Sequence, residues 1–180
     1  MNGIYHTLVG YAGGTKDNPS YYALGDHTET LQIEYDPSLI SFKEILQVFW
    51  DSHNPVSRSG SRQYAAIIFY HNEEQKEAAL ESRTVLEQQL QKTIYTEVLP
   101  YSRFFPAEDY HQKYYLQGNR ELTAEMRSYY PDFKDFIRST AAARLNGYLG
   151  GFGNAALLDA EIDQLGLSSR GREVILNQVD

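Results

Sequence analysis

The sequence predicts an α+β protein, with a strand-rich first part crossed by two helices and a helical C-terminal tail. Three observations support this prediction. The segment TETLQIEY at residues 28–35 alternates with a period of two, which is typical of a strand. Residues 41–51 and 73–90 combine helical spacing of apolar residues with good helix formers. From residue 119 onward the pattern is helical, interrupted once by glycines at 147–153.

Four segments rich in β-branched and aromatic residues are the expected strands. They are YHTLVGY, TETLQIEY, QYAAIIFY and TIYTEVL, at residues 5–11, 28–35, 63–70 and 93–99. The third is expected to be buried on both faces. In the second, Glu29 shares a face with three apolar residues, which is costly for a carboxylate unless it is paired or functional.

The two helices of this part have clear start signals. Ser41 is the expected N-cap of the first, because Glu44 follows three residues later and completes a capping box. This helix buries an aromatic stripe that includes Trp50, and it stops at His53-Asn54-Pro55. Asn72 is the expected N-cap of the second helix.

The remaining chain is predicted to be mainly helical. Pro106, in FFPAEDYHQKYY, stands at an expected helix start. Further helices are expected at residues 121–129, 133–145, 155–165 and 168–179. We therefore expect a single domain, with an α/β core at residues 1–118 and a helical extension at 119–180 packed on that core.

Composition excludes several classes of function. The 180-residue chain has a net charge of −8 and no basic block between aromatics, so we expect no nucleic-acid partner. No signal peptide is recognised and no run approaches the ~20 apolar residues of a membrane span, so a cytoplasmic protein is expected. The chain contains no cysteine, which excludes disulfides and a thiol nucleophile. The five histidines are scattered, so no metal site is expected.

Several motifs in order carry a family resemblance. They are GYAGG, NPSYY, GDHTE, IEYDP, RQYAA, FYHNEEQ and FFPAEDYHQKYY, followed more weakly by STAAARLNGYLGG. In this order and spacing, they resemble the A class of peptide methionine sulfoxide reductases. The resemblance implies a two-layer α/β sandwich with a mixed, mainly antiparallel sheet. It also implies thiol-dependent reduction of the S epimer of methionine sulfoxide in proteins or as the free amino acid.

The resemblance also implies roles for individual residues. Glu29 matches the family's general acid, and burial of this carboxyl on an apolar face would favour the proton-bearing form. Tyr11 and Tyr64 match the phenols that hold the sulfoxide oxygen. His27, Tyr110 and His111 are expected to line the substrate pocket, although His27 also fits a purely structural, hydrogen-bonded role. No bound cofactor is implied, and the reductant is an external thiol such as thioredoxin or dithiothreitol.

Other positions depart from the family pattern. Its nucleophilic cysteine belongs to a Gly-Cys-Phe-Trp motif, expected upstream of Met1 and absent from this chain. Ser59 stands where many members have aspartate, and Leu149 stands where some have a recycling cysteine. Three hypotheses follow: a reductase lacking its N-terminus, a non-catalytic module that binds methionine sulfoxide, and an interaction protein that self-associates through an exposed first strand or needs a partner chain.

Overall fold

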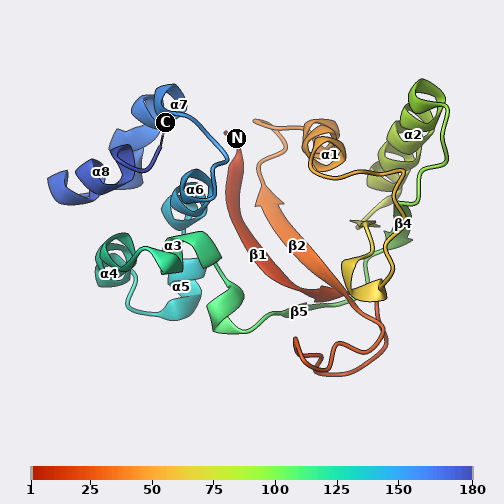
Figure 1. The fold of residues 1–180 in the computed structure, drawn as a ribbon, viewed down its shortest axis with the longest axis horizontal. Helices are drawn as coiled ribbons and strands as arrows, with labels where there is room; N and C mark the ends of the chain where they lie inside the picture. The colour runs from red at the N-terminus through yellow and green to blue at the C-terminus, as the bar shows by residue number, and fades with distance from the viewer. Residues whose placement is uncertain (1, 180) are drawn as a thin grey trace. The chain divides into compact units, whose positions relative to one another are not determined.

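The computed structural model describes residues 2–179, which divide into two compact units (Figure 1). The first contains residues 2–3, 9–31 and 36–107, and the second contains residues 4–8, 32–35 and 108–179. Over the described residues the chain forms five strands, eight α-helices and three short 3₁₀ helices. The predicted α+β class is therefore confirmed.

The strands form two sheets. The three-stranded sheet has the order β2-β1-β5, with β1 at Ile4–Ala12, β2 at Thr28–Tyr35 and β5 at Phe104–Pro106. The two-stranded sheet pairs β3 (Ile67–Tyr70) with β4 (Glu97–Pro100) in parallel. Strand β1 is the central strand of the first sheet, and β5 pairs with it at Gly10–Ala12. The expected self-association through the first strand stays a prediction.

One expected strand begins as a helix. Residues predicted to open the strand at 63–70 instead form the 3₁₀ helix η1, Arg62–Tyr64, because the Ser61 hydroxyl caps it by accepting a hydrogen bond from the Gln63 amide. The strand itself starts at Ile67, and Ile68 is its one buried residue, so burial on both faces was also wrong. The strand expected at 93–99 is shorter and shifted to β4.

The two long helices of the first unit confirm their predicted caps. Helix α1 (Phe42–Asp51) starts with the Ser41–Glu44 capping box, and α2 (Glu73–Leu90) starts at Asn72, whose side chain accepts from the Gln75 amide. Trp50 is 7% exposed, and its Nε1 donates to Ser82 Oγ at 3.1 Å. Trp50 belongs to a buried core with Leu46, Ile68, Ala79 and Ile94.

The second unit is helical around its own core. Its helices are α3 (Tyr114–Gly118), α4 (Arg120–Tyr129), α5 (Phe133–Ile137), α6 (Thr140–Leu149), α7 (Ala155–Glu161) and α8 (Ser169–Leu176). The helix expected at 133–145 is divided, because the Ser139 hydroxyl caps a new helix by accepting from the Ala142 amide. Fully buried residues include Leu122, Met126, Phe136, Leu145 and Ile175.

The helix expected to start at Pro106 is not formed. Pro106 ends strand β5 rather than starting a helix, and the following 3₁₀ helix η2 covers Asp109–His111.

Among residues 2–179, no helix is both long enough and apolar enough to cross a bilayer.

Candidate functional site

The loop between β1 and β2 is held in place by Asp26 and His27, two of the three residues of the GDHTE motif that precede β2. The Asp26 carboxylate accepts from the backbone amide of Thr15 at 2.8 Å and from its hydroxyl at 2.9 Å. The backbone bond and then the side-chain bond from Thr15 lower the pKa of Asp26 to about 2. Asp26 therefore remains an anion that fixes this loop throughout the neutral range.

His27 also holds this loop, from a buried position in the first unit. The side chain is 1% exposed, its Nδ1 accepts from the Gly14 amide at 3.1 Å, and its Nε2 donates to the Lys16 carbonyl at 2.8 Å. Gly14 suits this close approach, because a Cβ there would lie 2.6 Å from the His27 amide nitrogen. Both ring nitrogens are thus bonded to main chain, which gives His27 a structural role in this loop.

Glu29 is the second residue of β2 and follows directly after this loop. The expectation that it sits on a buried apolar face was wrong, since Glu29 is exposed and Leu31, two residues on, is 54% exposed. The buried neighbour is Thr28, which is 1% exposed. Its hydroxyl contacts the Gln63 and Ala65 carbonyl oxygens at 3.0 and 3.1 Å. The start of β2 is therefore tied to η1 and the residue that follows it.

These contacts of Thr28 place Tyr64 near Glu29 and near a tyrosine of the loop between β1 and β2. Tyr64 is 61% exposed, and its pKa is raised by the charge of Tyr21, by desolvation, by the charge of Glu29 and by a side-chain hydrogen bond with Tyr21. Tyr64 therefore keeps its proton at neutral pH and can donate a hydrogen bond. Tyr21 and Glu29 are thus the side chains whose charge or hydrogen bond acts on Tyr64.

Tyr21 was not among the residues singled out from the sequence. It belongs to the NPSYY motif, is 37% exposed, and packs edge to face on Tyr22 with ring centroids 5.3 Å apart. The NPSYY motif, one of those that carry the family resemblance, therefore already contained Tyr21. Tyr11, which had been expected to hold the sulfoxide oxygen, is 2% exposed and belongs to a core cluster with Leu24 and Ala107.

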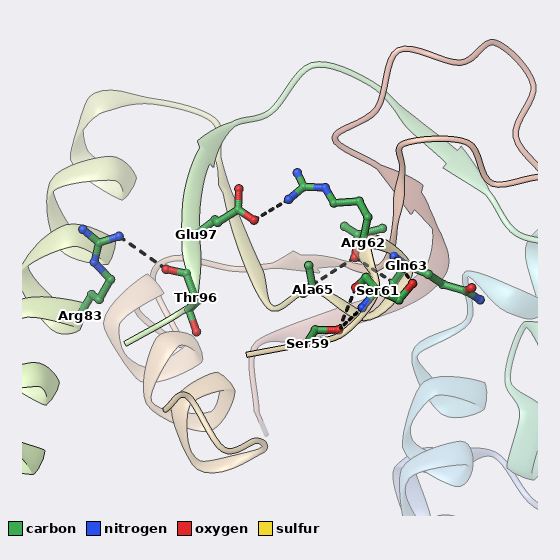
Figure 2. Close-up of polar contacts among 9 residues, drawn as sticks. Ser59, Ser61, Arg62, Gln63, Ala65, Arg83, Thr96 and Glu97 are labelled. Carbon is green, nitrogen blue, oxygen red and sulfur yellow. Dashed lines mark hydrogen bonds and ion pairs between the residues drawn. The ribbon is translucent and has the colours of Figure 1, made fainter. Parts of the chain in front are cut away.

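The 3₁₀ helix η1 is also fixed on its other side (Figure 2). Figure 2 shows Arg62 and Gln63 extending from η1 in opposite directions, with Arg62 paired to Glu97 of β4. Ser59, which occupies the position of the expected family aspartate, donates its hydroxyl to the Ser61 carbonyl at 2.8 Å. Ser59 thus supports the start of η1.

The remaining predicted pocket residues belong to the second unit. Tyr110 is 54% exposed, and its ring lies 4.2 Å from the His111 ring, centroid to centroid. Both residues are in η2, which precedes α3. Within residues 2–179, no group of three or more histidine, aspartate or glutamate side chains is placed to hold a metal ion.

Comparison with known proteins defines the class to which this fold and site belong. The family profile described as peptide methionine sulfoxide reductase matches residues 1–144. A second profile, described as the helical domain of selenoprotein methionine sulfoxide reductase A, matches residues 134–179. The chain therefore belongs to the peptide methionine sulfoxide reductase family.

Individual relatives agree with this assignment. A peptide methionine sulfoxide reductase of Drosophila melanogaster is 43% identical over 182 residues, covering 99% of this chain and 72% of that protein. The Methanosarcina acetivorans enzyme MsrA is 40% identical over 126 residues, covering 64% of this chain and 67% of that protein. The crystal structure of reduced Mxr1 from Saccharomyces cerevisiae superposes with a TM-score of 0.59 at 27% identity, covering 66% of this chain and 73% of that chain.

Proposed function

We propose that this chain recognises methionine S-sulfoxide, in proteins or as the free amino acid, and holds the proton-donating half of a reductase site. The observation that supports it most is the meeting of Tyr21, Glu29 and Tyr64 on one exposed part of the first unit. Two phenols and a carboxyl form a set suited to a sulfoxide oxygen, which accepts hydrogen bonds and must be protonated before it leaves.

The roles within the set follow from the chemistry of each group. Tyr64 and Tyr21 donate hydrogen bonds to the oxygen, because a phenol hydroxyl donates without being charged. Glu29 supplies the proton as general acid. We propose Tyr21 as a further phenol for the oxygen, because it lies on the exposed side of the set, while the oxygen-binding role expected of buried Tyr11 stays a prediction.

The other half of the reaction requires sulfur. A thiolate attacks the sulfoxide sulfur, and the resulting intermediate is resolved by a second thiol, such as one of thioredoxin or dithiothreitol. The chain has no cysteine, and neither serine nor tyrosine gives an intermediate that a thiol reductant can resolve. We therefore propose that the chain binds sulfoxide but does not reduce it by itself.

Binding can be measured by calorimetry with blocked methionine S-sulfoxide, meaning the amino acid with acetylated and amidated ends. We expect measurable binding that weakens about three- to tenfold in Glu29→Gln and in Tyr64→Phe, because each loses one polar contact with the oxygen. Tyr95→Phe is the matched control, since Tyr95 is a 49% exposed tyrosine outside the set. Absence of heat up to millimolar sulfoxide would rule out the proposed recognition.

A further inference from the structure

The Glu29 carboxyl has a neighbour that the roles above leave unused. Nε2 of Gln63 donates to Oε1 of Glu29 at 2.7 Å, which is a short, well-formed hydrogen bond. The two residues are 34 positions apart in the sequence, so the contact depends on the fold. One carboxyl oxygen of Glu29 is thereby occupied.

Gln63 is held in place independently of this bond. Its backbone amide donates to Ser61 Oγ at 3.2 Å, and its carbonyl accepts from the Thr28 hydroxyl at 3.0 Å. The preceding residue, Arg62, is paired with Glu97. Since these contacts already tie η1 to β2 and β4, the Gln63 side chain is not needed to hold η1. Its amide therefore acts on the orientation of the carboxyl.

The amide is suited to a carboxyl that must gain and lose a proton. A neutral amide N–H can donate both to an ionised carboxylate and to the carbonyl oxygen of a protonated carboxyl, and it favours the ionised form less than a lysine or arginine would. With Oε1 engaged, the proton of the acid resides on Oε2. The bond to Gln63 can thus persist through protonation and proton transfer.

We propose that Gln63 is a positioning residue that fixes the Glu29 carboxyl in one rotamer and leaves Oε2 to carry the proton toward the sulfoxide oxygen. This inference deepens the proposed function and rests on it for its consequence in sulfoxide binding. The orientation of Glu29 itself is a property of the unliganded chain and is tested separately.

The test uses the full chain and the variant Gln63→Leu, which has a similar volume and no donor. Gln47→Leu is the matched control, because Gln47 Nε2 makes the same kind of bond, at 3.0 Å, to Asp51 on the exposed side of α1. Three-bond NMR couplings of the Glu29 side chain, measured without ligand, report its rotamers. We expect one dominant rotamer in the parent chain and in Gln47→Leu, and averaged couplings in Gln63→Leu.

Two results would overturn the inference without reference to any ligand: averaged couplings in the parent chain, or an unchanged single rotamer in Gln63→Leu. Calorimetry with blocked methionine S-sulfoxide then measures the consequence, expected as about threefold weaker binding in Gln63→Leu and less than a 1.5-fold change in Gln47→Leu. Equal affinity of Gln63→Leu and the parent would also contradict positioning. A parent chain that binds no sulfoxide would refute the proposed function, while the couplings still decide the role of Gln63.

Discussion

Replacing Phe136 with alanine is expected to lower the free energy of unfolding by about 3–5 kcal/mol, because it removes a fully buried ring and leaves a cavity. Phe136 is 0% exposed in α5, within the core of the second unit. Its ring lies 5.8 Å from the Phe133 ring and 5.7 Å from the Arg127 guanidinium carbon, so the loss includes aromatic and cation–π contacts. Denaturant unfolding followed by circular dichroism measures the change.

Phe152→Ala is the matched control for this prediction. Phe152 is also a phenylalanine of the second unit, but it is 78% exposed, so its truncation is expected to change the free energy of unfolding by less than about 0.5 kcal/mol. Similar losses for the two variants would show that the described core of the second unit does not exist in solution.

The second large effect is a dependence of stability on pH that arises from Lys113. This lysine is 4% exposed in the second unit, and its Nζ donates to the carbonyl and hydroxyl oxygens of Thr7. Desolvation lowers the pKa of Lys113 from 10.5 to about 8. Between pH 8 and 10.5 the unfolded chain therefore binds more protons than the folded one, so this residue makes stability rise with pH across that window.

The size of the rise follows from the shift in pKa, which corresponds to roughly 3 kcal/mol. The measurement is the difference in free energy of unfolding between the parent chain and Lys113→Met at several pH values from 7.5 to 10.5. Comparing the two chains cancels the titration of tyrosines, which both contain. We expect the difference to move in favour of the parent as pH rises. A difference that stays constant would mean that Lys113 keeps an ordinary proton affinity in the folded state.

Local signals in the sequence predicted the elements that depend on them. The Ser41–Glu44 capping box and the Asn72 cap lie within one turn of the helices they start, so their residues identify those helices directly. The alternation at residues 28–35 likewise identified β2. Alternation shows that a strand has two faces, but it does not show which face becomes buried. The exposure of Glu29 therefore could not be predicted.

The site itself depends on contacts between distant residues. Thr28 is buried because its hydroxyl bonds to carbonyls 35 and 37 residues away, and that contact also sets η1 beside Glu29. Tyr21 reaches Tyr64 from a loop whose start is fixed by Asp26 and His27. Neither arrangement has a signature at a fixed short spacing. Family motifs indicated Glu29 and Tyr64, whereas the partnership with Tyr21 and the bond from Gln63 became visible in the structure.

A turnover assay tests most directly whether this chain holds the proton-donating half of a reductase site without the sulfur half. The purified chain is mixed with a peptide containing methionine S-sulfoxide and excess dithiothreitol, and reduction of the peptide is followed by mass. The cysteine-free sequence predicts no reduction above the rate of dithiothreitol alone. Clear, stereospecific reduction that disappears in Glu29→Gln would contradict the account, because another group in this chain would then perform the step assigned to a thiolate.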